Sequence, residues 1–462
     1  MVLVEQIYTS CLSQASYYIE SNGEAAIIDP LREIDTYLKL AKENNAKIKY
    51  IFETHIHADF VSGHLTLSNA TGAPIIFGPN TITSYPVTIA EDQQVFKLGN
   101  LTFVALHTPG HTLESTTYLL KDNLGKDHAI FTGDTLFVGD VGRPDLAQKQ
   151  SGKTQRDMAG MLFDSLRKKI MPLSDDVIVY PAHGAGSACG KKISRETFST
   201  LGNQKSSNYA LNKSLSKEEF INELTEGLES PPAYFPMNVK MNQEGYNHIE
   251  NILKKNLNPL DADEFEKLAN QSGVLILDVR NQIQFAEEHI PGSIFIGIDG
   301  GFAPWVGAIV GDVKRPILLI TPKGREKETI TRLARVGFDN VLGFLEGGLS
   351  SWKVKGKKTD SVSTIEASKL GKKIFDQTKI IDVRKNSEFS NGHLKNALNI
   401  PLDQLSKNFD EIPLEGDFFV HCAGGYRSMI ASSILKSRGI DSMTDIIGGF
   451  SAIKSSGIPI EV

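Results

Sequence analysis

The sequence predicts a multidomain α/β protein with parallel sheets. In the first 200 residues, apolar segments of strand length alternate with segments of helical periodicity. In the second half, a unit of about 100 residues occurs twice, and strands alternate with helices in both copies. The chain has 462 residues, which suggests about two to four domains. Its 40% hydrophobic content is enough for a core in each domain.

Charge and composition exclude several classes of function. Lys and Arg total 49 against 55 Asp and Glu, a formal net charge of −6, so we expect no nucleic-acid partner. No apolar run of about 18 residues suggests a membrane span, and no secretion signal is visible. The three cysteines, Cys11, Cys189 and Cys422, are too few for a disulfide framework. We therefore expect a cytoplasmic protein with no membrane partner.

The elements of the first half follow from hydrophobic periodicity. Strands are predicted at Ala25–Asp29, Ile48–Glu53, Leu101–His107, Ala129–Thr132 and Val177–Tyr180, and helices at Ile34–Glu43 and Met158–Lys169. Between Gly227 and Asp261, repeated prolines predict a connector with one short helix.

The repeat defines the second half. The strand that ends in Asp278-Val279-Arg280 recurs before Asp382-Val383-Arg384, and a histidine follows the aspartate by eleven residues in both copies. A further strand, Pro316–Ile320, corresponds to Asp417–His421. Strands alternating with helices in each copy favour parallel sheets.

Metal-ligand residues follow the strands of the first half. His55, His57 and Asp59 follow the strand Ile48–Glu53 in a His-x-His-x-Asp motif. His111, Asp134 and His183 follow three later strands, each next to glycine. Sites in open α/β sheets lie at the carboxyl ends of strands, so these side chains can converge. Imidazole and carboxylate ligands together suit Zn, Fe or Mn.

A thiol site is predicted near the C-terminus. Cys422 lies between a strand and a helical run, in the loop Cys-Ala-Gly-Gly-Tyr-Arg that ends at Arg427. Backbone N–H groups at such a turn, the helix dipole and the arginine all favour the nucleophilic thiolate. Gly425 lets the backbone curl around the sulfur.

The metal motif resembles that of the metallo-β-lactamase superfamily, which implies an αβ/βα sandwich. The superfamily commonly has a histidine at the sixth position of the motif, where this chain has Phe60, so a dinuclear zinc site would lose a ligand. Within the superfamily the sequence is most similar to persulfide dioxygenases, in particular to members fused to rhodanese domains. That resemblance implies one Fe(II) per chain, held by His55, His111 and Asp134, with zinc as a possible substitute. It leaves His57, Asp59 and His183 as supporting groups or as ligands of a weak second metal site.

Two further residues are candidates for substrate contact. Arg143, in Gly-Arg-Pro-Asp, either binds a substrate carboxylate or pairs with Asp145. Cys189 either holds a persulfide near the iron, with Lys191 favouring its thiolate, or is a buried small residue.

The repeated unit resembles the rhodanese domain, whose catalytic cysteine corresponds to Cys422; Gly425 and Arg427 match its loop. A tyrosine phosphatase loop would have one residue more between cysteine and arginine. In the first copy Thr321 stands opposite Cys422, so this copy is predicted to be inactive. The predicted domains are 1–255, metallo-β-lactamase-like with the connector; 256–359, rhodanese-like and inactive; and 360–462, rhodanese and active.

Together the resemblances imply a persulfide dioxygenase and thiosulfate sulfurtransferase for sulfide detoxification. Its partners would be a small-molecule persulfide, O₂, and sulfite or thiosulfate, and the subgroup is commonly homo-oligomeric. Two alternatives remain: a zinc-dependent thioesterase of the glyoxalase II type, or a regulatory module whose rhodanese copies dock partners. The identity of the bound metal would distinguish the thioesterase from the dioxygenase. Persulfide formation on Cys422 would distinguish an active sulfurtransferase from a regulatory module.

Overall fold

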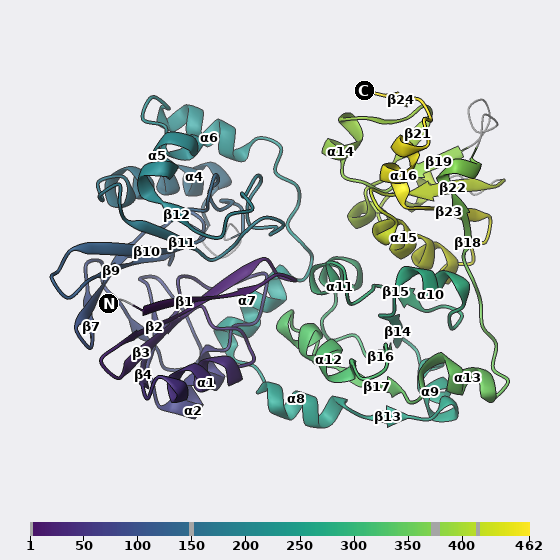
Figure 1. The fold of residues 1–462 in the computed structure, drawn as a ribbon, viewed down its shortest axis with the longest axis horizontal. Coiled ribbons are helices and arrows are strands. Elements are labelled where there is room, and N and C mark those ends of the chain that lie inside the picture. Colours follow the sequence, from purple (N-terminus) through teal and green to yellow (C-terminus); the bar gives the residue numbers. More distant parts are fainter. Residues whose placement is uncertain (1–2, 147–151, 371–378, 413–415) are drawn as a thin grey trace. The chain divides into compact units, whose positions relative to one another are not determined.

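The chain forms two compact units. The computed structural model describes residues 3–146, 152–370, 379–412 and 416–462. The first unit comprises Met1–Ile252 together with Ala334–Gly337, and the second comprises Leu253–Leu333 and Phe338–Val462. Figure 1 follows the elements along the chain.

The first unit contains two six-stranded sheets. One has the order β1-β2-β3-β4-β5-β6, and the other β12-β11-β10-β9-β8-β7. The first sheet consists of β1 (Leu3–Thr9), β2 (Gln14–Ser21), β3 (Glu24–Ile28), β4 (Lys47–Phe52), β5 (Ile75–Phe77) and β6 (Thr88–Ile89). The second consists of β7 (Val95–Leu98), β8 (Leu101–His107), β9 (Thr116–Lys121), β10 (Asp127–Gly133), β11 (Ile178–Pro181) and β12 (Ser199–Thr200).

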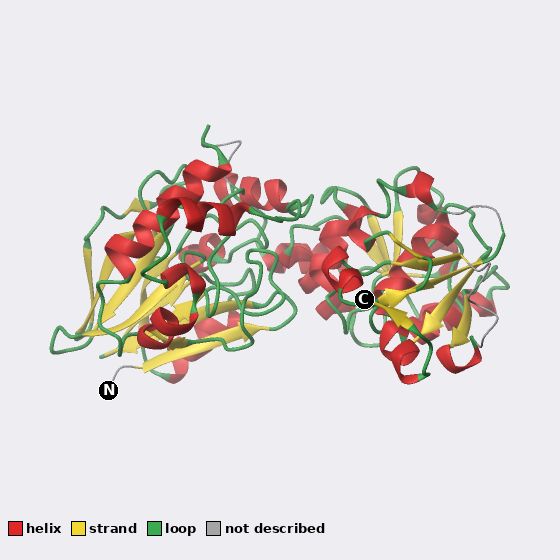
Figure 2. Cartoon of the chain, turned by 90° about the horizontal axis from the view of Figure 1, so that it is seen from above, coloured by secondary structure: helices red, strands yellow, loops and turns green. Residues whose placement is uncertain are grey.

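The sheets pack face to face, and helices cover their outer faces. Phe52, Phe103 and Phe131 belong to the core cluster between the two sheets. Two other clusters lie on the outer faces, where α1 (Asp35–Glu43) and α2 (His64–Thr71) cover the first sheet, and α4 (Gln155–Ser165), α5 (Leu201–Ser207) and α6 (Lys217–Thr225) cover the second. In Figure 2 the helices lie outside the strands of this unit. The predicted αβ/βα sandwich is confirmed.

The predicted helix at Met158–Lys169 has different limits. Thr154 and Asp157 form a capping box, so α4 begins before the first apolar residue of the pattern. The helix then continues as a π-helical turn over Leu166–Ile170.

The connector after Gly227 contains two helices, whereas the sequence predicts one short helix. These are α7 (Phe235–Glu244) and α8 (Ile249–Asn256). Pro236 lies in the first turn of α7, where a helix tolerates proline because no intrahelical N–H is needed. The buried residues of α7 include Asn238 and Asn242, so its inner face carries little of the apolar periodicity that reveals a helix.

The second unit contains two five-stranded sheets, one from each copy of the repeat. Their orders are β13-β17-β16-β14-β15 and β18-β23-β22-β19-β21, and the paired strands in both are parallel, as predicted. The first has β13 (Pro259–Leu260), β14 (Leu275–Asp278), β15 (Ile294–Phe295), β16 (Ile317–Ile320) and β17 (Val341–Leu345). The second has β18 (Ser363–Glu366), β19 (Lys379–Asp382), β21 (Ala397–Asn399), β22 (Phe418–His421) and β23 (Met443–Ile447); β20 (His393–Leu394) pairs separately with β24 (Ile460–Glu461).

Helices follow the strands in both copies. They are α9 (Ala262–Ala269), α10 (Gln282–Glu287), α11 (Phe302–Val310), α12 (Glu326–Arg335) and α13 (Gly348–Val354) in the first, and α14 (Asn386–Ser390), α15 (Tyr426–Ser437) and α16 (Gly449–Ser455) in the second.

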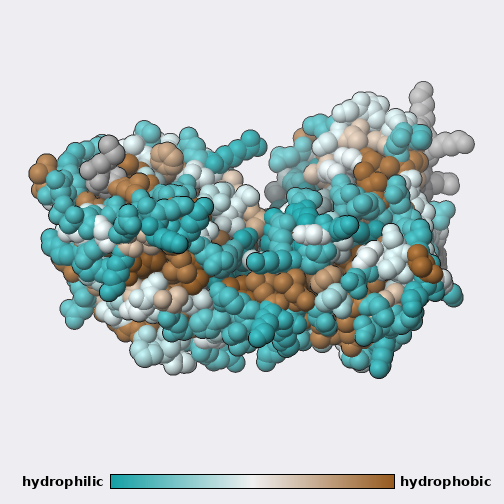
Figure 3. Space-filling model, turned by 60° about the horizontal axis from the view of Figure 1, so that its bottom comes forward, coloured by the Kyte–Doolittle hydropathy of each residue, from teal (hydrophilic) through white to brown (hydrophobic). Residues whose placement is uncertain are grey.

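One face of the molecule shows how polar and apolar side chains are distributed on it. On the face drawn in Figure 3, apolar side chains lie in separate patches among polar ones. Within the described ranges, no helix has the length and apolar character needed to cross a membrane.

Candidate functional site

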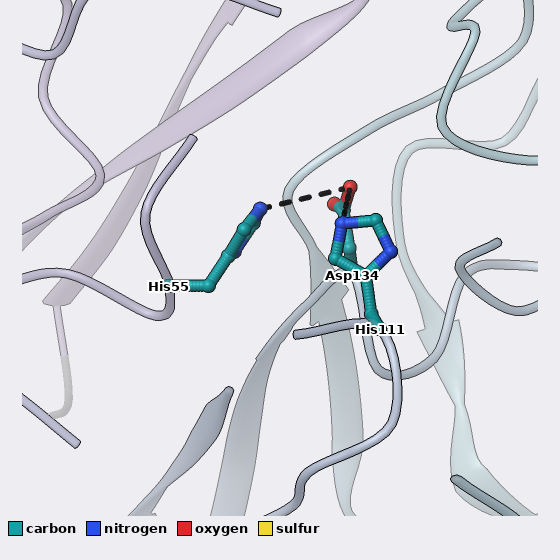
Figure 4. Close-up of side chains that lie close together, drawn as sticks. All are labelled: His55, His111 and Asp134. Carbon is teal, nitrogen blue, oxygen red and sulfur yellow. Dashed lines mark ion pairs between the residues drawn. The ribbon is translucent and has the colours of Figure 1, made fainter. Parts of the chain in front are cut away.

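Three predicted metal ligands converge at the strand ends of the first unit. His55 follows β4, His111 follows β8, and Asp134 follows β10. The Oδ2 atom of Asp134 lies 3.8 Å from Nε2 of His55 and 3.4 Å from Nε2 of His111 (Figure 4). All three side chains are buried, and their donor atoms lie close enough to bind one ion.

The two histidine rings present Nε2 to this cluster because Nδ1 is engaged elsewhere. Nδ1 of His111 lies 2.8 Å from the carbonyl oxygen of Arg143, which can only accept, so Nδ1 carries the proton. Nδ1 of His55 lies 3.0 Å from the hydroxyl of Thr54, which itself donates to Asp29 and therefore accepts from the ring. Burial lowers the pKa of His55 well below its ordinary value, with a further contribution from His57. A neutral ring with a free Nε2 lone pair is the form that binds metal.

Asp134 is oriented by His183. Nδ1 of His183 donates to Oδ1 of Asp134 at 2.7 Å, and its Nε2 donates to Oδ2 of Asp59 at 2.8 Å. Burial alone would lower the pKa of His183, but Asp134 and Asp59 outweigh it and hold the pKa well above its ordinary value. The other oxygen of Asp134, Oδ2, is buried with no hydrogen-bond partner among the described residues. A buried carboxylate oxygen without a partner is costly, and a cation at this point would offset that cost.

His57 lies beside His55 but belongs to a different group of side chains. Its Nε2 lies 3.2 Å from Oδ1 of Asp29 and 3.3 Å from Oε2 of Glu53. Burial disfavours the charged ring, yet the two carboxylates outweigh burial and raise the pKa of His57. The ring of Phe60 packs against His57 with centroids 4.4 Å apart and offers no donor atom. His57 therefore groups with Asp29 and Glu53, whose ligand atoms lie close enough to hold an ion of their own, and Phe60 at the sixth position cannot coordinate one.

Cys189 lies beside the cluster but without the predicted lysine. It groups with Asp59 and His183, and the three are buried. The prediction that Lys191 favours the thiolate of Cys189 is wrong. The ammonium group of Lys191 instead donates to the carbonyl oxygens of Glu223 and Glu226. Burial, together with the charges of Asp134 and Asp59, instead raises the pKa of Cys189 well above its ordinary value.

The side chain of Arg143 pairs with a carboxylate of the protein itself. Its guanidinium donates to both carboxylate oxygens of Asp145, at 2.6 and 2.7 Å, and to the carbonyl oxygens of Ala188 and Glu229. These four hydrogen bonds favour the Arg–Asp pair over the alternative of a substrate carboxylate. The residue contributes to the site through its carbonyl oxygen, which fixes His111.

Three supporting residues were missed by the sequence analysis. Asp29 and Glu53 end predicted strands, so their position was a usable signal. Asn242 gave no such signal in the sequence, because it lies in the segment interpreted as a connector. Its amide donates to the carbonyl oxygens of His57 and Phe60, both at 2.8 Å, and accepts from the N–H of Ser62. Helix α7 thereby fixes the backbone of the loop that carries the motif.

The thiol loop of the second unit lies between β22 and α15. Cys422 is 1% exposed, and the N–H of Gly425 points at its sulfur over 3.1 Å. Gly425 has a φ of 97°, a conformation that favours glycine. Arg427 forms a bidentate pair with Glu388 of α14, at 2.6 and 2.7 Å, which no sequence motif had indicated. Thr321 occupies the corresponding place after β16 in the first copy.

Two family models match parts of the chain. Residues 9–183 match the metallo-beta-lactamase superfamily, and residues 261–355 and 366–456 match the rhodanese-like domain. The crystal structure of a metallo-beta-lactamase from Staphylococcus aureus subsp. aureus COL superposes with a TM-score of 0.66 at 31% identity, covering 74% of this chain and 98% of that one.

Curated relatives carry two different names. The probable hydroxyacylglutathione hydrolase glo2 of Schizosaccharomyces pombe is 31% identical over 179 residues, or 38% of this chain; the match spans 64% of that relative, less than two thirds of its length. The mitochondrial persulfide dioxygenase ETHE1 of Homo sapiens is 28% identical over 224 residues, 48% of this chain and 79% of that protein.

Proposed function

Because the chain belongs to the metallo-beta-lactamase superfamily and carries two rhodanese-like domains after that fold, we propose that it is a persulfide dioxygenase joined to a thiosulfate sulfurtransferase. The first activity converts R–S–SH, O₂ and H₂O into R–SH and sulfite. The second moves a sulfane sulfur through Cys422. We also propose domain boundaries near residues 255 and 360, and that the first rhodanese-like copy is inactive.

The observation that carries the proposal is the donor set. His55, His111 and Asp134 supply two imidazole nitrogens and one carboxylate oxygen, while His57 is held by Asp29 and Glu53. Two histidines and one carboxylate are typical of mononuclear non-haem Fe(II) oxygenases. A three-histidine zinc site would need His57 to leave two buried carboxylates.

Fe(II) bound there would supply open coordination positions and the redox chemistry for oxygen transfer. The chain's own residues orient the donors. Thr54 and the carbonyl of Arg143 hold the two rings, and protonated His183 holds Asp134 so that Oδ2 faces both imidazoles. The burial of all three donor side chains excludes bulk water, which would otherwise hydrate the carboxylate.

The sulfurtransferase step uses Cys422. Its thiolate attacks the outer sulfur of thiosulfate, a sulfur–sulfur bond forms to the cysteine, and sulfite leaves with the electron pair of the broken bond. A thiolate R–S⁻ then attacks the outer sulfur of this persulfide, giving R–S–S⁻ and restoring the Cys422 thiolate. The N–H of Gly425, the N-terminus of α15 and Arg427 stabilise negative charge at the sulfur. In the reverse direction, sulfite accepts the sulfur and becomes thiosulfate.

A zinc-dependent thioester hydrolase is the second candidate. It is favoured by relatives named hydroxyacylglutathione hydrolase, which match at identities similar to that of the persulfide dioxygenase. Phe60, which lacks a donor atom, speaks against its second metal.

The test is metal content combined with oxygen uptake. Protein purified without added metal should contain one iron per chain and, with glutathione persulfide, should consume O₂ and release sulfite in equal amounts. Asp134→Ala should lose both, whereas Cys422→Ser, the matched control, should retain them. Two zinc ions per chain, with thioester hydrolysis and no oxygen uptake, would establish the hydrolase instead.

A further inference from the structure

Tyr426 reaches out of the active thiol loop to the first rhodanese-like copy. Its hydroxyl donates to the carbonyl oxygen of Gly297 at 2.7 Å. Its ring packs edge-on against Phe295, with centroids 5.8 Å apart. Burial raises the pKa of Tyr426, so the phenol stays protonated and remains a donor.

The first copy is shaped to receive this ring. A Cβ atom at Gly300 would lie 2.3 Å from Cζ of Tyr426, so only glycine leaves room for the tyrosine. A second tie lies two turns along the same helix, where the hydroxyl of Ser433 accepts from the N–H of Phe295 at 3.0 Å. Both β15 and the loop after it therefore bind one face of α15.

The tie acts on the peptide that faces the catalytic sulfur. Tyr426 directly follows Gly425, whose N–H points at Sγ of Cys422. Tyr426 is also the first residue of α15, whose N-terminus faces the thiol. A side chain fixed at this position limits the directions in which the preceding N–H can point.

The corresponding residue of the first copy makes no such tie. Arg325 stands at that position and forms ion pairs with Asp299 and Glu328 of its own copy. Among the described residues, this loop position thus forms a contact between the copies in the thiol-bearing copy and ion pairs within its own copy in the other.

We propose that the first rhodanese-like copy positions the catalytic loop of the second, and that Tyr426 is the positioning residue through which it acts. This inference rests on the proposed sulfurtransferase function. The Tyr426 contact with Gly297 and Gly300 holds the Gly425 N–H on the sulfur, which favours thiolate and persulfide over the neutral thiol.

The test compares Tyr426→Phe with Ser437→Ala. Each removes one hydroxyl from α15, but that of Ser437 donates only within the helix, to Ile434. We expect Tyr426→Phe to lower kcat/KM for thiosulfate about tenfold, mainly through kcat, and to slow the alkylation of Cys422 at pH 7 by a similar factor, with a smaller effect at high pH. Alkylation rates of Cys422 across pH, followed by peptide mass spectrometry, measure this profile.

Gly300→Ala approaches the same contact from the first copy and should reproduce both effects. An unchanged pH profile in Tyr426→Phe and Gly300→Ala, with only a lowered melting temperature, would overturn the proposal. Failure of the wild type to take sulfur from thiosulfate would instead contradict the sulfurtransferase function, because the alkylation profile needs no substrate.

Discussion

The two rhodanese-like copies build the same loop and fill it differently. In the second, the N–H of Gly425 points at the sulfur of Cys422, 3.1 Å away. In the first, the N–H of Gly324 donates to Oε1 of Glu326 at 3.0 Å, and the hydroxyl of Thr321 is 3.3 Å from the same oxygen. The loop of the first copy therefore directs its glycine N–H to a carboxylate, whereas the loop of the second directs it to the cysteine sulfur.

The framework around the loops is nevertheless the same. The Asp-Val-Arg segments form internal ion pairs in both copies, Asp278 with Arg280 and Asp382 with Arg384. The following histidines stack on a phenylalanine one turn earlier, with ring centroids 4.0 Å apart at His289 and 3.9 Å at His393. These repeated residues maintain the fold, whereas the residues that set the chemistry lie in the loop. The same architecture thus holds a threonine in one copy and a thiol in the other.

The largest expected effect comes from exchanging the loop residues. Cys422→Ser should lower sulfur transfer from thiosulfate roughly 1,000-fold or more, because a hydroxyl is a far weaker nucleophile than a thiolate. In that background, Thr321→Cys should restore nothing, since the Glu326 carboxylate occupies the loop N–H group and raises the pKa of a neighbouring thiol. Adding Glu326→Arg recreates the Cys-x-x-Gly-x-Arg pattern and should give a measurable persulfide on the introduced thiol.

Intact mass after thiosulfate treatment measures each variant as the gain of one sulfur atom. Glu326→Arg without the cysteine is the matched control and should gain none. Sulfur uptake by the Thr321→Cys variant with Glu326 in place would show that the carboxylate does not block this loop.

Arg427 provides the next contrast, because the first copy has Glu326 at that position. Arg427→Ala should lower kcat/KM for thiosulfate about 10- to 100-fold, since it removes a cation that interacts with the sulfur and breaks the bidentate pair with Glu388. Glu388→Gln should cost less, because the arginine keeps its charge and loses only its orientation. Steady-state kinetics with thiosulfate and cyanide measure both changes.

Arg438→Ala serves as the control at the far end of α15. Its guanidinium lies over the ring of Phe409, away from the loop. An equal loss of activity in Arg438→Ala and Arg427→Ala would mean that helix stability, rather than charge at the sulfur, accounts for the effect.

Much of this architecture is predictable from periodicity. The strand Leu101–His107 has the predicted limits, and His55, His111 and Asp134 converge because their strands end at one edge of the sandwich. Period-two and period-3.6 patterns report which face of an element is buried, and strand ends report where polar groups can meet. The fold and the members of the candidate cluster therefore follow from local sequence.

The directions of the side chains were not predictable. His57 belongs to the same motif as His55, yet it pairs with Asp29, which directly follows another strand, β3. Nothing in a linear motif encodes that competition between a carboxylate pair and a metal. Lys191 is near Cys189 in sequence, but the carbonyl oxygens of Glu223 and Glu226 bind its ammonium group. Asn242 escaped detection because a buried polar face leaves no hydrophobic pattern.

The smallest expected effect concerns stability and sharpens the contrast between β17 and β23. Asp445 of β23 is 2% exposed, and burial raises its pKa to about 7, whereas the first copy has Phe344 at the corresponding position. The folded state binds the proton more tightly than the unfolded chain, so the free energy of unfolding should fall as pH rises from about 4 to about 7 and then level off. Asp445→Asn should stabilise the second copy by about 2 kcal/mol at pH 8 and by almost nothing at pH 5, because the amide never ionises and the carboxyl of the folded state is itself protonated at pH 5. Scanning calorimetry at the two pH values measures this, with Phe344→Leu as the control whose effect should not depend on pH. A gain of the same size at both pH values would mean that packing, and not the charge of Asp445, is responsible.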